Sequence, residues 1–302
     1  MTLLMGTLQL GLIYGLLALG IFITFRLLNI PDLTADGSFT LGLAVSAVFT
    51  VAGHPILGII LAMVVGGFAG GVTGLLQTKM NIHPILAGII TMSGLYSINL
   101  FIMGESSNVS LIGSETIFTL VSTELQGLTN NTVKLLVASL FCLVLWFILV
   151  QLFKTHLGLS IRATGNNEDM VRASSINVHG VKIIALAIAN ACIALSGAII
   201  AQYQGFADIS SGIGIMVIGL ASVIIGEVLL GNRSVTVGLL SAIIGSILYR
   251  SIIAFALSRD LFPAYALKFV SAVIVGVALS LPAIKSYINL RKIKRRATKC
   301  SN

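Results

Sequence analysis

Two aspartates, Asp32 and Asp36, are the first side chains in this sequence that could take part in binding or proton chemistry. They stand in the stretch NIPDLTADGSFTLGLAV, residues 29–45, between two long regions that carry no charged residue apart from His54. Carboxylates here can line a polar path for a solute, or they can cap the short helix that follows, because acidic groups are favoured near helix N-termini. The sequence leaves both interpretations open and favours capping.

Residues for catalysis or metal binding are not assembled elsewhere in the chain. The sequence offers no paired carboxylates, nucleophile triad or metal cluster, and its histidines and cysteines lack ligand or disulfide spacing. The pattern G-x-x-x-x-G-K-[ST], which cradles ATP phosphates, does not occur. We therefore predict that the protein is not an enzyme and holds no metal or cofactor of its own. The residues concerned are His54, His83, His156, His179, Cys142, Cys192 and Cys300.

The composition predicts an integral membrane protein. The chain has 302 residues, of which 57% are hydrophobic, and its mean hydropathy is +1.05. Charged residues make up 9%, against roughly 25% in soluble domains. The apolar runs are continuous rather than alternating, which argues against a membrane β-barrel. We expect an all-α polytopic membrane protein in which residues 1–302 form one transmembrane domain.

Nine stretches are long and apolar enough to span a bilayer, which takes about 20 residues. Ten spans would result if a broken helix is divided differently. The nine stretches are residues 3–25, 37–53, 56–78, 84–103, 133–153, 183–204, 212–230, 235–257 and 265–284.

The distribution of basic residues predicts the orientation, because cytoplasmic loops are enriched in Lys and Arg. Fourteen of the 18 basic residues fall on one side if the N-terminus is outside and the C-terminus cytoplasmic. Seven of them lie in the tail, residues 285–302. Such a run after a membrane helix is expected to bind anionic lipid rather than nucleic acid.

Two segments resemble each other and predict an inverted repeat with halves at about 1–153 and 183–284. DLTADGSFTLGLAVSAVF begins at Asp32 and DISSGIGIMVIGLASVII begins at Asp208, and an odd number of spans separates them. Paired interrupted segments of this kind point to a substrate path in transporters.

Polar residues inside or beside the spans are the candidates for this path. For those of the fourth and sixth spans, hydrogen bonding between helices is the alternative. Toward the cytoplasmic end of its span, Glu227 is expected to pair with Arg233. The path candidates are Asp32, Asp36, Ser93, Ser97, Asn99, Asn190, Gln202, Asp208, Ser210 and Ser211.

The cytoplasmic loop, residues 154–182, is the least membrane-like segment. Asn166 or Asn167 can cap a helix, and acidic residues follow in its first turn. Met170 gives this short helix an apolar side. We predict an amphipathic helix here, with an ordinary connecting loop as the alternative.

The stretch GLSIRATGNNEDMVRASSIN, within this loop, resembles the coupling-helix segment of permease subunits of bacterial ABC importers. The branch concerned includes branched-chain amino-acid, ribose and nucleoside permeases. IPDLTADGSFTLGLAVSA, LLGNRSVTVGLL and LFPAYALKFVSAVIVGVAL are similar to one subgroup, the amino-acid transport permeases of tryptophan/tyrosine type. The resemblance covers essentially the whole chain, in matching order.

The resemblance implies a multi-pass protein of the bacterial cell membrane that imports a small organic solute, with an aromatic amino acid favoured. A second permease chain, expected to be identical, would complete the path. Separate ATPase subunits would bind ATP and Mg, and an extracellular lipoprotein-type binding protein would deliver the solute. A sugar or nucleoside permease is the alternative, and an ion-coupled secondary transporter is a further one. The residues implied in ATPase coupling are Gly165, Asn166, Asn167, Glu168, Asp169, Met170, Val171 and Arg172.

Overall fold

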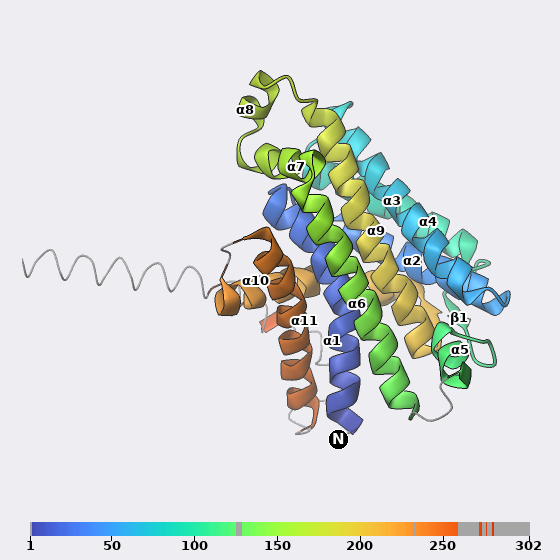
Figure 1. The fold of residues 1–302 in the computed structure, drawn as a ribbon. Coiled ribbons are helices and arrows are strands. Elements are labelled where there is room, and N and C mark those ends of the chain that lie inside the picture. Colours follow the sequence, from blue (N-terminus) through green and yellow to red (C-terminus); the bar gives the residue numbers. More distant parts are fainter. Residues whose placement is uncertain are drawn as a thin grey trace, which may run out of the picture.

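The computed structural model describes residues 2–124, 129–231 and 234–258, together with residues 272, 273, 276 and 280. Within these residues the chain is almost entirely helical (Figure 1). The predicted span 265–284 and the basic tail 285–302 lie outside the described ranges, apart from those four positions.

Eight helices of the described part are long and apolar enough to cross a membrane, and they coincide with the first eight predicted spans. Helix α1 continues into a π-helical turn, η1, and α10 follows the 3-10 turn η2, so both of these spans are irregular at one end. The number of spans in the whole chain stays a prediction. The elements are α1 (Thr2–Ile21), η1 (Phe22–Leu27), α2 (Thr34–Val51), α3 (Pro55–Thr78), α4 (Pro84–Ile102), α6 (Asn130–Lys154), α9 (Val178–Gln204), η2 (Ile209–Gly212), α10 (Ile215–Leu230) and α11 (Val235–Ser258).

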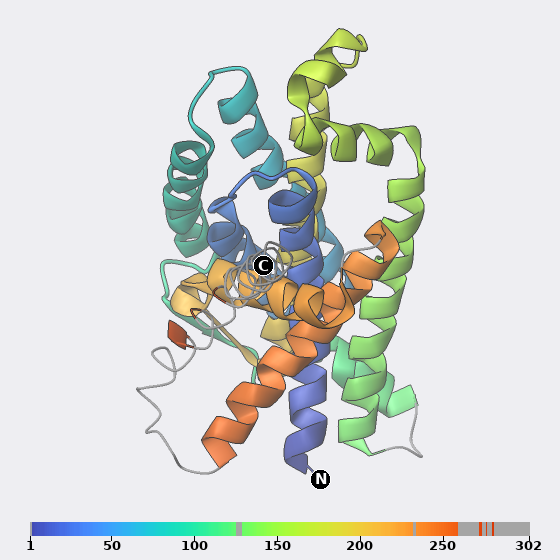
Figure 2. The ribbon, with the colours of Figure 1, turned by 90° about the vertical axis from the view of Figure 1, so that its left-hand side faces the viewer.

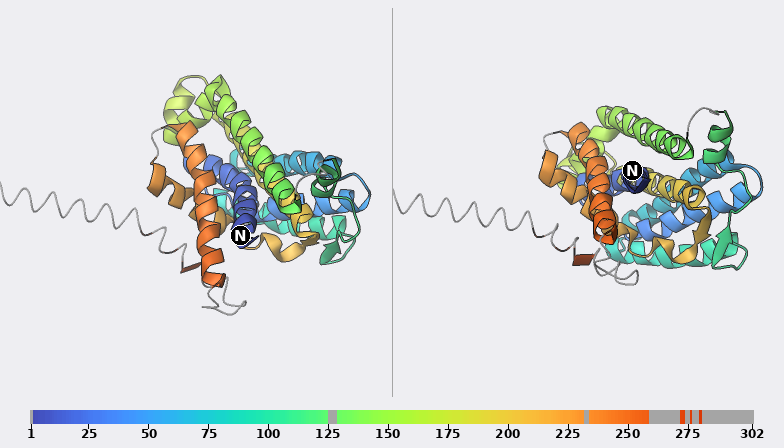
Figure 3. Two further views of the ribbon diagram at one scale, coloured as in Figure 1. Left: turned by 60° about the horizontal axis from the view of Figure 1, so that its bottom comes forward. Right: turned by 90° about the horizontal axis from the view of Figure 1, so that it is seen from below.

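Shorter elements mark the two ends of the molecule. Helices α7 (His156–Asn166) and α8 (Glu168–Ala173) lie together at one end (Figure 1). Helix α5 (Ile117–Glu124) lies at the other end, beside α6 and the end of α9 (Figure 3). There, strand β1 (Asn108–Ser110) pairs antiparallel with β2 (Phe206–Asp208), and Asn108 lies opposite Asp208.

Helices α2 and α9 form the centre of the molecule, with α3 and α4 on one side and α6 on the other (Figure 2). Their backbones are in direct contact at two glycines: Gly42 of α2 lies on the carbonyl of Ala194, and Gly197 of α9 lies on the carbonyl of Phe39. Small residues allow such close approach, which drives helix association in membranes.

Helices of the two predicted repeat halves pack in a similar pattern. Helices α1 and α9 run in opposite directions (Figure 1), and α1 packs on α11 as α9 packs on α3. Gly42 of α2 lies on Ala194 of α9, and the matching Gly219 of α10 lies on Ile21 of α1. The repeat itself stays an interpretation of this pattern.

Candidate translocation path and coupling surface

Asp32 is buried in the segment between the first two spans and belongs to a network of hydrogen bonds between polar groups of α2, α3, α4 and α9. Its side chain is 2% exposed; Oδ1 accepts a hydrogen bond from Thr34 N at 3.0 Å and Oδ2 accepts one from Asn190 Nδ2 at 2.7 Å. The Thr34 hydroxyl lies 2.8 Å from that of Thr73, which donates to Thr91 at 2.9 Å. Burial raises the pKa of the Asp32 carboxyl, and the bonds from Thr34 and Asn190 oppose that rise. The contact with Thr34 N agrees with a capping role at the start of α2.

Asp36 caps a different helix from the one expected. Helix α2 already begins at Thr34, so Asp36 lies inside its first turn. Its two carboxylate oxygens accept hydrogen bonds from Gly214 N at 2.9 Å and Met216 N at 2.8 Å. These N–H groups belong to the start of α10, where they have no partner within the helix. Asp36 thus joins the start of α2 to the start of α10.

We expect Asp36→Ala to destabilise the protein by about 2 kcal/mol, because charged acceptors of backbone N–H groups contribute roughly that much. The measurement is thermal unfolding in detergent, followed by the reaction of a fluorescent thiol probe with Cys142 and Cys192, which are both buried. Asp36→Asn is the matched control: it keeps one acceptor oxygen and should lose about half as much. Equal stability of all three proteins would contradict the capping role.

The path candidates of α4 divide into exposed and buried residues. Ser93 and Ser97 lie on the uncovered face of α4, together with Tyr96. Asn99 is buried and donates to the carbonyl of Gly37 at 3.3 Å, while its Oδ1 has no hydrogen-bond partner among the residues described. Asn99 and Asp36 line one small cavity of about 40 Å³. The structure therefore brings these two predicted residues together.

Gln202 and Asn190 hold helices together. Gln202 is 3% exposed; its Nε2 donates to Ser46 Oγ and to the carbonyl of Pro55, and its Oε1 accepts from Ile117 N. Asn190 is fully buried against Asp32. For both residues the geometry favours the alternative of interhelical hydrogen bonding.

Asp208 is the last residue of β2, and Ser210 and Ser211 belong to the turn η2 that follows it and packs against α2. Asp208 Oδ1 accepts hydrogen bonds from the backbone N–H and the hydroxyl of Ser210. This is a local turn, and the structure does not bring it into contact with Asp32.

Glu227 pairs with a residue that was not expected, and its expected contact with Arg233 stays a prediction. Glu227 Oε1 lies 2.7 Å from Nε of Arg26, at the end of the first span. Arg233 lies outside the described residues. Arg26 and Glu227 are 201 positions apart in the sequence. The packing of α10 near η1 brings their side chains together, which the local sequence does not indicate.

The predicted amphipathic helix exists as α8, and Asn167 is its cap. Asn167 Oδ1 accepts from Met170 N at 3.0 Å. Met170 is 64% exposed, whereas Val171 is buried at 2%. Helix α8 thus packs Val171 against the rest of the protein and presents the apolar side chain of Met170 on its exposed side.

The same loop holds a second helix, α7, that we did not expect. Gly165 and Asn166, which the resemblance groups with the coupling residues, belong to its last turn rather than to α8. A Cβ on Gly165 would overlap the carbonyl of Leu27, so α7 lies directly on the end of the first span. Helix α7 therefore contacts both α8 and η1.

Glu168 fixes α8 to the following span. Its carboxylate lies 2.6 Å from Lys182 Nζ and 2.8 Å from Arg172 Nη2. The hydrogen bond from Lys182, followed by that from Arg172, lowers the pKa of Glu168 below its usual value of 4.5.

A depressed pKa means that this contact stabilises α8 fully above about pH 4.5 and that the contribution is lost as the pH falls through the lower, folded pKa. We expect amide hydrogen exchange of residues 168–173, corrected for intrinsic rates, to rise below pH 4.5 in the wild type. Glu168→Gln should show faster exchange at pH 7 and no such pH dependence. A wild-type exchange pattern in this variant would refute the ion-pair anchor.

The described part of the chain is therefore a predominantly helical protein with eight helices long and apolar enough to cross a membrane. The chain belongs to the family described as branched-chain amino acid transport system / permease component, which matches residues 3–281. It is therefore an ABC permease of the branched-chain amino-acid and sugar type, as the resemblance of its motifs predicted.

Three relatives illustrate this family. A tyrosine transport system permease protein of Clostridioides difficile is 37% identical over 88% of this chain and 86% of its own length. An uncharacterized protein of Rickettsia prowazekii, RP368, is 32% identical over 93% of this chain and 98% of its own. The ribose import permease protein RbsC of Haemophilus influenzae is 25% identical over 69% of this chain and 64% of its own. No solved structure matches the chain significantly.

Proposed function

We propose that this chain is the permease subunit of an ABC importer that carries an aromatic amino acid across the bacterial cell membrane. The observation that carries the proposal is the 37% identity to a tyrosine transport permease over most of both chains. Two permease chains, taken here as identical copies, enclose the path between them.

The exposed face of α4 supports a path of this kind. Ser93, Ser97 and Tyr96 lie uncovered in the middle of a spanning helix. Polar groups facing lipid are costly, so such a face is expected to meet water or another protein chain. A second permease copy, with an aqueous path between the two, satisfies this requirement.

The exposed helix α8 supports coupling to a separate ATPase. We take its end of the molecule as cytoplasmic, in accordance with the charge distribution of the sequence. The ATPase binds ATP and Mg and contacts α8 around Met170. An extracellular lipoprotein-type binding protein delivers the solute at the opposite end, near β1 and β2.

The similarity to a ribose import permease leaves a sugar or nucleoside as the alternative solute. An ion-coupled carrier differs in requiring no partner. One experiment separates these proposals: reconstitute the permease, its ATPase and its binding protein in liposomes and measure uptake of labelled tyrosine, ribose and uridine. We expect uptake of tyrosine that requires ATP and all three components.

Two outcomes would refute the proposal. Uptake by the permease alone along an ion gradient would identify a secondary transporter. Uptake of ribose or uridine in place of any amino acid would establish the alternative substrate class. A thermal-shift screen of the binding protein against amino acids checks the solute independently.

A further inference from the structure

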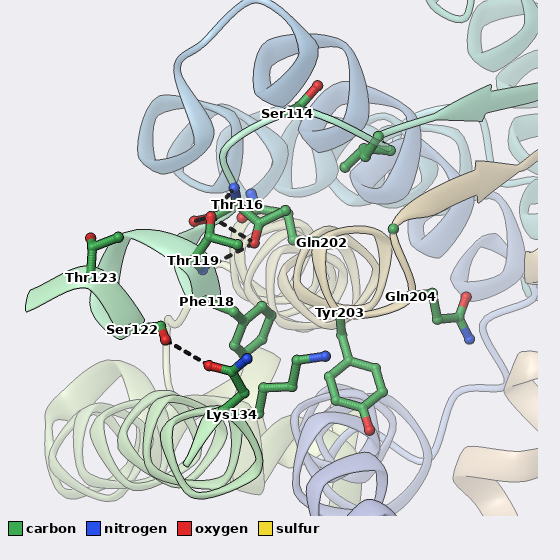
Figure 4. A pocket seen from close by; sticks show the side chains of 13 residues that line it. Ser114, Thr116, Phe118, Thr119, Ser122, Thr123, Lys134, Gln202, Tyr203 and Gln204 are labelled. Carbon is green, nitrogen blue, oxygen red and sulfur yellow. Dashed lines mark hydrogen bonds between the residues drawn. The ribbon is translucent and has the colours of Figure 1, made fainter. Parts of the chain in front are cut away.

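A cavity of about 540 Å³ lies between α5, α6 and the end of α9, at the end of the molecule opposite α8 (Figure 4). It is separate from the small cavity beside Asp36, since the two share no lining residue. Its volume falls within the range of roughly 300–1,000 Å³ that is usual for small-molecule sites. The side chains that the following argument uses are Phe118, Thr119, Ser122, Asn130, Lys134 and Tyr203.

Lys134 gives this cavity a positive charge that no lining residue neutralises. The ammonium group lies 5.1 Å from the centre of the Tyr203 ring and reaches into the space between that ring and Phe118 (Figure 4). None of the described residues that line the cavity is acidic. Within the described part of the chain, no carboxylate lies within ion-pair distance of Lys134. A lysine ammonium has three donors and no acceptor, so an oxyanion in the cavity can accept hydrogen bonds from it and balance its charge.

The walls around Lys134 are held in place by hydrogen bonds. Ser122 donates to Asn130 Oδ1 at 2.8 Å, which leaves the Asn130 amide N–H groups available as donors. The Thr119 hydroxyl donates to the carbonyl of Thr116 at 2.8 Å. These two hydroxyl protons are used within the protein, so the Asn130 amide is the donor that remains beside Lys134, and its orientation is fixed before an oxyanion binds.

Two aromatic rings form the apolar side of the cavity. Phe118 and Tyr203 meet edge to face, with centroids 6.0 Å apart and planes at 77°. The Tyr203 hydroxyl donates to Gln9 Oε1 at 2.8 Å, so its ring orientation is fixed from behind. Aromatic groups favour such edge contacts with a further ring.

We propose that this cavity binds a small aromatic carboxylate, with the carboxylate on Lys134 and the ring against Phe118 and Tyr203. The site is distinct from the path at Asp36 and would hold solute at the end where it is delivered. The use of L-tyrosine as a probe rests on the proposed function, whereas the assignment of an aromatic carboxylate rests on the cavity alone.

The test is ligand-observed saturation-transfer NMR on the full-length permease, without its partners, in phosphatidylcholine nanodiscs. The probes are L-tyrosine, 3-(4-hydroxyphenyl)propionate, which lacks the amine, and tyramine, which lacks the carboxylate. We expect both carboxylates to bind and tyramine to bind about fivefold more weakly, which is the upper end of what one partly exposed charge pair contributes.

Variants of α6 localise the binding. Lys134→Met should weaken both carboxylates about fivefold, and Lys134→Arg should remain within about twofold of the wild type. Lys154→Met is the matched control, since Lys154 is an exposed lysine at the other end of the same helix. It should bind as the wild type does. Thermal unfolding of each variant verifies that it is folded.

Several results would overturn the inference: no binding of either carboxylate, tyramine binding equally well, or no effect of Lys134→Met. Loss of binding in nanodiscs containing phosphatidylglycerol would identify a lipid phosphate as the occupant instead.

Failure of this binding test differs from failure of the proposed function. ATP-driven tyrosine uptake by an assembly whose permease binds no aromatic carboxylate would refute the cavity alone. Carboxylate binding by a permease whose assembly imports no amino acid would refute the transport proposal alone.

Discussion

Met170→Asp is expected to release the ATPase from the permease and to reduce ATP-driven uptake at least tenfold. Met170 is 64% exposed on α8 and is the apolar centre of the surface that we assign to the ATPase. Burying a methionine contributes about 1.5–3 kcal/mol, and an aspartate there would leave a buried charge without a partner. Co-purification of tagged permease with its ATPase measures the release.

Met80→Asp is the control for this result. Met80 follows α3 at the same end of the molecule and is 67% exposed, so it matches Met170 in residue type and exposure. It should retain the ATPase. If the Met170 variant keeps its ATPase, or if both variants lose it equally, α8 is not the specific coupling element.

Gly42→Ala is expected to destabilise the protein by about 3 kcal/mol, because overpacking of a close contact costs roughly that much. A Cβ at Gly42 would overlap the carbonyl oxygen of Ala194, which is backbone and cannot rotate away. Helices α2 and α9 would have to separate along their buried interface. The thiol-probe assay on Cys142 and Cys192 reports the loss as a lower melting temperature.

Gly71→Ala supplies the comparison. Gly71 is also in the interior of a spanning helix, but a Cβ there would meet no atom within 4 Å. We expect this variant to melt at or slightly above the wild-type temperature, since alanine is the better helix former. A similar loss in both variants would show that the α2–α9 contact at Gly42 does not govern the effect.

The sequence predicted most of the membrane helices because each is a long apolar run with few competing interpretations. The unexpected helix α7, HLGLSIRATGN, is short and polar, and its position depends on packing against α6, α9 and the end of the first span at Leu27. The predicted cap of α8 was correct because Asn167 and Met170 are three residues apart. Local patterns of this kind can be read directly from a sequence.

The contacts of the candidate path were less predictable because their partners are distant in sequence. Asp36 lies 178 positions from Gly214, and Asp32 lies 158 from Asn190. Nothing in the local sequence indicates that Asp36 caps α10 rather than its own helix. The cavity at Lys134 was missed for the same reason, since its walls come from three separate helices and the sequence shows only a single basic residue.

The burial of α2 has a consequence for how the protein is made. Helix α2 has the lowest mean hydropathy of the eight spans described, 1.3, yet 78% of it is buried inside the protein. Its central partner α9 is completed about 150 residues later, which at ordinary rates of synthesis is roughly 10–30 s. For that interval the nascent chain must keep a weakly apolar segment near the translocon or against its neighbours α1 and α3. Insertion of this permease is therefore expected to depend on a late event, the arrival of α9, rather than on each span entering the lipid by itself.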